Sequence, residues 1–303
     1  MVSVTRNKLV LYTAIYPAVE PYFRSWSTSV FQQEDRDFDL WVSIDSLAVD
    51  QVLRSFPDGL RPARLISSTG KSPAAIRIEA IEEMADSYDA VVFVDADDLL
   101  HRSRVAAARH FLKTVDVAGC ALKIIDENGC EIGVTFGPEA EDPVSLLPTH
   151  NVFGLSNTAY RSEVLRRCLP LSADSEMIDW QLATLAFTRG ATLGFDSTPR
   201  MYYRQYNGNF ANVLPPFSPH QVSLAATRIL DHYRCLLDNA NNFPAEHRNT
   251  WIAARNRAEA FHERISCDSE TLDRYVHALN RLSPRYIWWW CVAHPELEAI
   301  WRN

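Results

Sequence analysis

The chain has 303 residues, of which 47% are hydrophobic and 22% are charged, and its formal net charge is −8 at pH 7. This balance is typical of a globular protein and excludes a disordered chain. A chain of this length buries about three quarters of the surface that its unfolded form exposes, so its core needs no disulfide or metal staple. The acidic charge argues against a nucleic-acid partner, which calls for a basic face that displaces counterions.

The N-terminal half alternates short apolar runs with stretches of helical periodicity. Buried strands are predicted at four runs: 8–13, 38–44, 64–67 and 90–94. Helices are predicted between them, at 19–31 and 73–85. Strands that alternate with helices predict an α/β fold, with a mostly parallel twisted sheet covered by helices on both faces.

The second half changes from this alternation to a run of helices. After a helix at 102–113, the pattern predicts strands at 117–125 and 131–136, joined by a tight turn at Asp126-Glu127-Asn128-Gly129. Two helices, 162–167 and 176–189, and two strands, 191–195 and 200–206, follow. From residue 219 the chain is helical, with further helices at 249–265 and 269–282. We therefore expect an α/β domain over residues 1–214 and a C-terminal helical appendage over residues 215–303.

The cysteines and the lengths of the apolar runs indicate the cellular compartment of the protein. The six cysteines form no C-x-x-C pair and show no zinc-like spacing, so we expect free thiols and a reducing, cytoplasmic setting. The first apolar stretch lacks a small-residue cleavage site and is interpreted as a strand, not a signal peptide. No segment approaches the ~20 apolar residues that span a bilayer.

An acidic run, Asp95-Ala96-Asp97-Asp98, directly follows the apolar strand residues Val91-Val92-Phe93-Val94. Asp45 ends the second predicted strand in the same way, and in open α/β sheets ligands bind at the carboxyl ends of the strands. Crowded carboxylates repel one another unless they share a cation. Mn²⁺ and Mg²⁺ commonly take one or two carboxylates and complete their shell with phosphate oxygens. The alternative is a turn that only caps the next helix.

The order of these features resembles family 2 glycosyltransferases of the GT-A fold. Arg77, after Gly70, matches the basic position of a G-x-x-x-A-R-N-like segment, although Ile78 stands where that family usually has Asn. The run ending in Asp95-Ala96-Asp97-Asp98 matches its D-x-D-D segment. Two later segments are similar to its E-D-W and Y-R-Q-H-x-x-N segments: Ser175 to Trp180 and Tyr202 to Asn209. The resemblance spans roughly residues 8–212.

The resemblance implies a site for a nucleotide-diphosphate sugar. Asp45 would contact the base, Arg77 would support the nucleotide or diphosphate, and Asp97 would be the principal ligand of Mn²⁺ or Mg²⁺. Arg204 would lie on a loop that closes over the diphosphate. The remaining implied donor-site residues are Thr13 and Ile15, which would line the nucleotide cleft, with Asp95 and Ala96 near the ribose or sugar. The family's histidine is Tyr206 here, and a neutral phenol is a poor metal ligand, so the metal shell would rely on Asp97 and water.

Asp179 is the candidate catalytic base. An acceptor hydroxyl is a weak nucleophile, and a positioned carboxylate can take its proton as it attacks the anomeric carbon, with inversion. A carboxylate in the first turn of a helix also has a purely structural explanation, since it interacts favourably with the helix dipole. The resemblance favours catalysis.

The functional prediction is an inverting glycosyltransferase that uses a nucleotide-diphosphate sugar, a divalent cation and a carbohydrate or lipid-linked hydroxyl acceptor. A sugar nucleotidyltransferase is less favoured, because it needs an early glycine-rich phosphate loop and the first glycine here is Gly59. A non-catalytic nucleotide- or carbohydrate-binding relative stays open because of Ile78 and Tyr206.

Several other residues have two interpretations. Tyr286-Ile287-Trp288-Trp289-Trp290, preceded by Arg281 and Arg285, suits a peripheral membrane contact. Packing of the appendage against the catalytic domain, or against a second subunit in a homodimer, is favoured instead. Trp180 could stack on a sugar or fill the core. His150 and Asn151 could line the acceptor side, with a structural role favoured.

Overall fold

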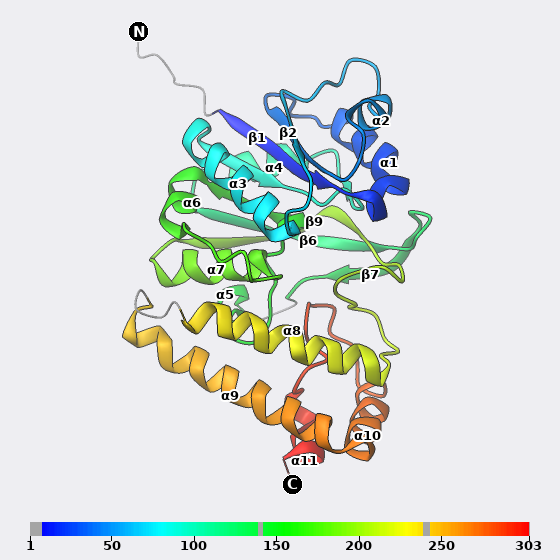
Figure 1. Ribbon diagram of the computed structural model, residues 1–303, viewed down its shortest axis with the longest axis vertical. Helices are drawn as coiled ribbons and strands as arrows, with labels where there is room; N and C mark the ends of the chain where they lie inside the picture. Colours follow the sequence, from blue (N-terminus) through cyan, green and yellow to red (C-terminus); the bar gives the residue numbers. More distant parts are fainter. Residues whose placement is uncertain (1–7, 139–141, 239–242, 303) are drawn as a thin grey trace.

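The computed structural model describes residues 8–138, 142–238 and 243–302 (Figure 1). The strands are β1 (Leu9–Ile15), β2 (Asp39–Asp45), β3 (Arg64–Ser68), β4 (Ala90–Phe93), β5 (Leu99–Leu100), β6 (Val117–Ile125), β7 (Glu131–Phe136), β8 (Thr158–Arg161) and β9 (Leu193–Arg204). The α-helices are α1 (Glu20–Phe31), α2 (Val49–Arg54), α3 (Pro73–Ser87), α4 (Arg104–Phe111), α5 (Pro143–Leu146), α6 (Ser162–Cys168), α7 (Ile178–Thr188), α8 (Pro219–Asp238), α9 (Ala245–Cys267), α10 (Ser269–Leu279) and α11 (Glu298–Trp301). Short 3-10 helices are η1 (Pro17–Val19), η2 (Leu155–Asn157) and η4 (Pro295–Leu297).

All these strands join one sheet, in the order β3-β2-β1-β4-β8-β6-β9-β5, with β7 paired to β6. β3, β2, β1 and β4 run parallel to one another. β8 is antiparallel to both β4 and β6, and β9 is parallel to β6. β1 lies inside the parallel part and is almost wholly buried, which is why its sequence is a continuous apolar run.

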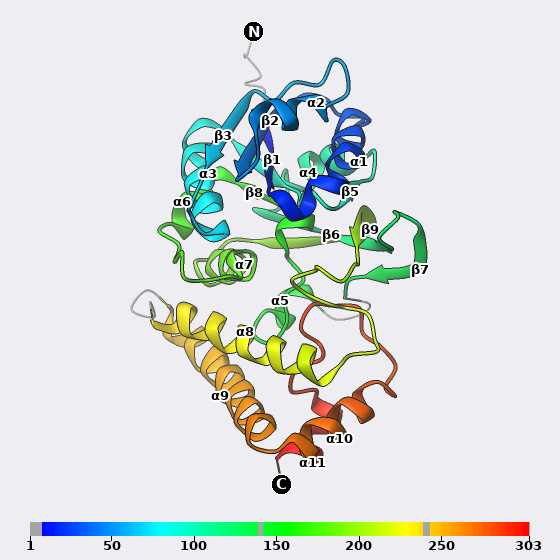
Figure 2. The same cartoon turned by 45° about the vertical axis from the view of Figure 1, so that its right-hand side comes forward.

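Helices cover both faces of the sheet, as predicted (Figure 2). On one face α1 lies beside α4, and the side chain of Gln33, just after α1, accepts a hydrogen bond from the N–H of Val105 at 3.1 Å. On the other face α3 packs against α6, and α6 packs against α7. The predicted fold class, α/β with a mostly parallel sheet, is therefore confirmed.

The main difference from the predicted elements lies near the end of the sheet. The two strands expected at 191–195 and 200–206 are one strand, β9. Beside it, β6 advances from Cys120 to Leu122 while β9 advances from Asp196 to Met201, so β9 carries a bulge. Inside the bulge, Asp196 accepts hydrogen bonds from the N–H of Thr198 and from Nε of Arg200. Short elements such as β5, with two residues, were not predicted because they are too short to show periodicity.

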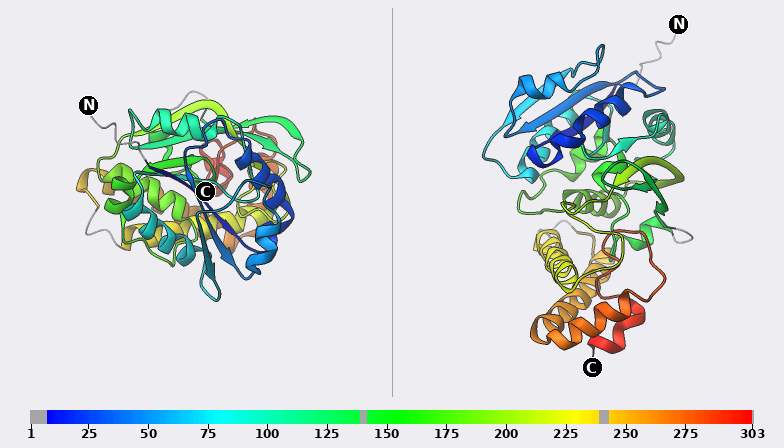
Figure 3. Two further views of the ribbon diagram at one scale, coloured as in Figure 1. Left: turned by 90° about the horizontal axis from the view of Figure 1, so that it is seen from above. Right: turned by 90° about the vertical axis from the view of Figure 1, so that its right-hand side faces the viewer.

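The C-terminal helices α8 to α11 lie together below the sheet and its helices (Figures 1 and 3). The tryptophan run ties them to the sheet: the ring of Trp288 lies 4.1 Å from that of Phe136 and 5.6 Å from that of Tyr203. Trp288, Trp289 and Trp290 are at most 7% exposed. The packing interpretation holds, and these rings are not available as membrane anchors. Among the described residues, no helix combines the length and apolar character needed to cross a membrane.

Candidate functional site

The acidic run directly follows the end of β4 and contains both partly exposed and buried carboxyl groups. Asp95 and Asp97 are partly exposed, whereas Ala96 and Asp98 are buried. Asp98 is 0% exposed and accepts hydrogen bonds from the hydroxyl of Ser156 and, at 2.8 Å, from the N–H of Arg204. Burial, together with the charges of Asp97 and Asp95, raises the pKa of Asp98 well above its usual range. Asp98 therefore fixes the run to its surroundings, and Asp95 and Asp97 are left to meet a ligand.

Two other predicted donor-site residues lie at the same edge of the sheet. Arg77, on α3, approaches Oδ1 of Asp95 with its Nη2 at 3.4 Å. Asp45 ends β2, which is separated from β4 by β1, and it is partly exposed. Its Oδ1 accepts a hydrogen bond from the hydroxyl of Ser46 at 2.8 Å. The parallel strand ends thus bring Asp45 and Asp95 to one edge, and α3 places Arg77 beside Asp95.

A cluster of tyrosines surrounds Asp97. The phenol of Tyr206 donates a hydrogen bond to Oδ2 of Asp97 at 2.9 Å, and the Tyr206 ring lies 5.0 Å from that of Tyr22. Burial and the charge of Asp95 raise the pKa of Asp97 to about 6, while the hydrogen bond from Tyr206 opposes this shift. Burial, followed by the charge of Asp97, raises the pKa of Tyr16, so Tyr16 also lies near the run.

The sequence reasoning missed Tyr16 because it chose the other face of β1. Thr13 and Ile15 are each 1% exposed, whereas Ala14 and Tyr16 are partly exposed. Successive side chains of a strand point to opposite faces, so the cleft-facing positions at this strand end are Ala14 and Tyr16. The side chains of Thr13 and Ile15, the two residues expected at the nucleotide cleft, are thus buried, and their part in the cleft stays a prediction.

The sequence predicts that Arg204 lies on a loop, but in the structure it is the last residue of β9. The residue is buried, with 2% of its surface exposed. Its Nε donates to the carbonyl of Asp97 at 2.7 Å, and its Nη1 donates to the carbonyls of Glu127 at 2.8 Å and Asp126 at 3.2 Å. The guanidinium also lies 4.6 Å from the centre of the Tyr22 ring. The residue thus braces the acidic run against the β6–β7 turn, and a direct contact with the donor stays a prediction.

Asp179 lies in the first turn of α7 and is partly buried. Its Oδ2 accepts a hydrogen bond from Nδ2 of Asn151 at 2.8 Å. Burial raises its pKa to about 6, opposed by the N–H of Trp180; the Asp95 carboxylate adds to the rise and Arg77 opposes it. Asp179 therefore lies within range of the charges of Asp95 and Arg77, from which it is distant in the sequence.

The donor atoms suit a cation that is shared with a substrate. Within the described residues, no three His, Cys, Asp or Glu side chains gather closely enough to hold a metal. Asp95 and Asp97 offer two partly exposed carboxylates, and the phenol of Tyr206 donates a hydrogen bond to Asp97. One or two carboxylates with phosphate oxygens is a common shell for Mg²⁺, so the residues fit a cation that arrives with a diphosphate.

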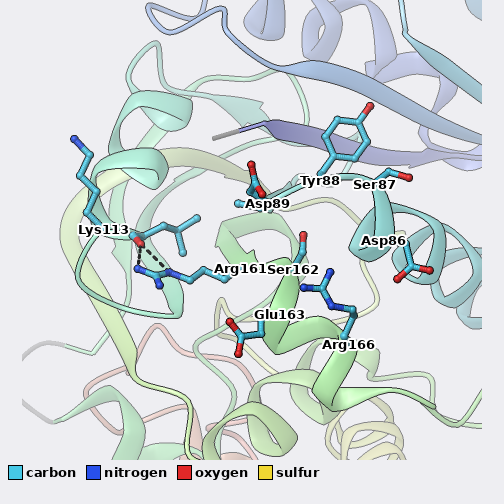
Figure 4. Close-up of a pocket in the computed structure, with 11 residues that line it drawn as sticks. Asp86, Ser87, Tyr88, Asp89, Lys113, Arg161, Ser162, Glu163 and Arg166 are labelled. Atoms are coloured by element: carbon cyan, nitrogen blue, oxygen red, sulfur yellow. Dashed lines mark hydrogen bonds between the residues drawn. The ribbon is translucent and has the colours of Figure 1, made fainter. Parts of the chain in front are cut away.

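A cavity of about 590 Å³ lies elsewhere, around the start of β4 and the end of β8 (Figure 4). Cations and carboxylates both line it: Lys113, Arg161 and Arg166 with Asp86, Asp89 and Glu163. The guanidinium of Arg161 donates to the carbonyl of Leu112. The acidic run follows the opposite end of β4, so this cavity is not part of the candidate site.

Comparison with known proteins relates the chain to others by fold. No protein-family model matches it, and no curated protein matches its sequence. Among solved structures, Staphylococcus aureus TarS, residues 1–349 in complex with UDP-GlcNAc, is similar over 89% of this chain and 86% of that chain, with 18% identity and a TM-score of 0.52. The mannosyltransferase PcManGT from Pyrobaculum calidifontis, in complex with GDP-Man and Mn²⁺, is similar over 91% and 80%, with 15% identity and a TM-score of 0.56. The likeness shows that the chain has this GT-A-like mixed α/β fold.

Proposed function

We propose that the chain is an inverting glycosyltransferase that moves a sugar from a nucleotide-diphosphate donor to a hydroxyl group of a carbohydrate or lipid-linked acceptor. The observation that carries the proposal is that Asp95, next to Asp97 in the acidic run, lies beside Arg77 and within range of the charge of Asp179. Fold-sharing proteins were solved with UDP-GlcNAc and with GDP-Man and Mn²⁺, which supports a nucleotide-sugar donor.

The residues divide between the donor and the acceptor. Asp45, at the end of β2, would contact the nucleotide base of the donor. Arg77 would stabilise the negative charge of the diphosphate. Asp179 would accept the proton of the acceptor hydroxyl as that oxygen attacks the anomeric carbon and the bond to the diphosphate breaks. A pKa of about 6 leaves Asp179 mostly ionised at neutral pH and still basic enough to take a proton.

A divalent cation is part of the proposal. Asp97, with Asp95 beside it, would hold Mn²⁺ or Mg²⁺ together with the diphosphate oxygens. When bound, the cation supplies Lewis-acid compensation for the negative charge of the diphosphate. Tyr206 donates to Asp97 and so competes for one of its oxygens.

The domain division is part of the same proposal. Residues 1–214 would hold the donor site, and residues 215–303 would complete the acceptor side. Pairs of aromatic rings join the two parts, among them Trp180 with His232 at 4.3 Å and Phe210 with Trp289 at 5.9 Å. Helix α8 therefore packs close to α7, the helix that carries Asp179.

The alternative is a relative that binds a nucleotide or carbohydrate without catalysis, favoured by the phenol that faces Asp97. One experiment separates the two. Release of UDP or GDP is measured from UDP-GlcNAc, UDP-glucose and GDP-mannose with Mn²⁺ or Mg²⁺. Asp179→Asn should lower release by about 10²-fold or more while calorimetry shows unchanged donor affinity.

The matched control is Asp273→Asn, an exposed carboxyl on α10, which should leave release unchanged. Near-normal release by Asp179→Asn would remove the base assignment. Binding of a donor without release by the unaltered protein would favour the non-catalytic alternative.

A further inference from the structure

We propose that Asn151 is a positioning residue for the proposed base Asp179, and that the C-terminal helix α8 holds Asn151 in place. The inference rests on the proposed function and deepens it. Asn151 is 1% exposed and lies in the segment between α5 and β8, where it donates from Nδ2 to Oδ2 of Asp179 at 2.8 Å.

The orientation of the Asn151 amide is fixed from its other side. Its Oδ1 accepts a hydrogen bond from the backbone N–H of Phe153 at 3.0 Å. A carbonyl oxygen can accept from an N–H and an amide nitrogen cannot, so the NH₂ group must face Asp179. The contact is therefore a donor directed at a carboxylate, which is stronger than a bond between neutral groups.

The segment that carries Asn151 is held by α7 and α8. Nε1 of Trp180 donates to the carbonyl of Leu147 at 2.8 Å, and the phenol of Tyr233, on α8, donates to the carbonyl of Pro148. The ring of His232, also on α8, stacks on Trp180 at 4.3 Å with an interplanar angle of 14°. α8 passes directly beside α7 and α5 (Figure 1). Trp180 and the α8 residues His232 and Tyr233 thus hold two parts of the site in place. One is α7, which carries Asp179, and the other is the segment that carries Asn151.

This arrangement has two consequences for Asp179. Asn151 holds one carboxylate oxygen, Oδ2, and so restrains the orientation in which the group meets an acceptor. The donated hydrogen bond also favours the ionised form. Backbone N–H groups of Trp180 and Asp179 also favour the ionised form of Asp179. Of the charged groups that act on it, the carboxylate of Asp95 disfavours that form and Arg77 favours it, and the charge of Asp179 in turn acts on the phenol of Tyr160.

The first test measures the protonation of Asp179 directly, without any substrate. The full chain is labelled with ¹³C at the aspartate carboxyl carbons, and the Asp179 signal is assigned by its loss in Asp179→Asn. In Asn151→Ala the apparent pKa of Asp179 should rise by about one unit. In Asn151→Asp, which keeps the acceptor for Phe153 N–H and replaces the donor by a second acceptor, it should rise further.

The matched control is Asn157→Ala. Asn157 is equally buried, six positions along, and its amide donates to the carbonyls of Cys120 and Val152 without contacting Asp179. Its loss should lower the thermal midpoint and leave the Asp179 titration unchanged. The inference is overturned if Asn151→Ala shifts the apparent pKa by less than about 0.3 units, or if Asn157→Ala shifts it equally.

The second test uses the reaction. Asn151→Ala should lower kcat for nucleotide release from UDP-GlcNAc or GDP-mannose, whichever the unaltered protein uses, about tenfold at pH 7 with KM for the donor unchanged. The pH below which kcat falls should rise by the same amount as the apparent pKa of Asp179. If the profile and kcat stay unaltered while the titration shifts, positioning for catalysis is overturned. If the unaltered protein releases nucleotide from no donor, the proposed function fails, while the titration still decides whether Asn151 sets the charge of Asp179.

Discussion

The phenol of Tyr206 donates a hydrogen bond to Oδ2 of Asp97 at 2.9 Å. The contact occupies an oxygen of the carboxylate that the proposal assigns to a cation, and it comes from the position where the resembled family has a histidine. Gly208 permits this approach, because a Cβ there would lie 2.7 Å from the Tyr206 ring. The residue at 206 should therefore control how tightly the cation is held.

Tyr206→His should tighten the binding of Mn²⁺ to the full chain about tenfold, because imidazole is a metal ligand and a neutral phenol is a poor one. The affinity is measured by isothermal calorimetry with MnCl₂ alone at pH 8, where Asp97 is ionised. Tyr206→Phe is the control, since it removes the hydrogen bond without adding a ligand. Equal affinities for the His and Phe variants would show that residue 206 does not face the cation.

Arg204 gives a prediction about stability. Arg204→Met keeps most of the side-chain volume but leaves the carbonyls of Asp97, Asp126 and Glu127 without their donor. We expect a loss of about 2–4 kcal/mol in the free energy of unfolding, because buried acceptors would lose charged partners. Urea unfolding measures it. Arg302→Met, which breaks a surface ion pair with Glu298, should cost less than about 1 kcal/mol. Similar losses in both variants would contradict the bracing role.

The part of the site that depends on local pattern could be predicted from the sequence. A fully apolar run that ends in carboxylates places Asp95 and Asp97 at the end of a buried strand, because strand burial and strand ends are encoded within a few residues. The turn at 126–129 was predicted for the same reason, and it joins β6 to β7.

The remaining features depend on tertiary packing. Which face of β1 meets the cleft is decided by the helices on each side, so Tyr16 could not be chosen over Ile15 from alternation alone. The pairing of Asn151 with Asp179 joins a loop to a helix, and no periodic pattern encodes it. The burial of the Arg204 guanidinium follows from β9 pairing with β6, a contact distant in sequence.

The pH dependence of nucleotide release should follow Asp179. Its pKa of about 6 means that the base is protonated below that pH, so the rate should fall about tenfold per unit there. An aspartate at its ordinary value of 3.8 would keep the rate level to about pH 4. The measurement is a kcat profile from pH 4 to 9 with the preferred donor. A level profile through pH 5 would contradict the assignment of Asp179.

The same shift predicts a sign for stability. The folded state binds the Asp179 proton more tightly than the unfolded state, so this group stabilises the fold most below pH 3.8 and loses that contribution as pH rises through about 6. The free energy of unfolding of Asp179→Asn, relative to that of the unaltered protein, should therefore rise by at most about 3 kcal/mol from pH 4 to pH 7. Urea unfolding at the two pH values measures it. A difference of the opposite sign would show that the pKa is lowered in the fold.

Trp288 and Gly154 form a contact that tests how the helical appendage is joined to the sheet. A Cβ on Gly154 would lie 2.5 Å from the indole ring of Trp288, which is itself 6% exposed. Trp288→Ala should lower the free energy of unfolding by about 3–5 kcal/mol, because it leaves a cavity. Gly154→Ala should lower it by about 1–3 kcal/mol, because the added methyl group overpacks the contact. In the double variant the added methyl group enters the vacated space, so the total loss should be smaller than the sum of the two single losses by about 1 kcal/mol or more. Urea unfolding of the four proteins completes the cycle. Additive losses would mean that the two residues are not in contact, and that the tryptophan run does not hold the appendage against the sheet in this way.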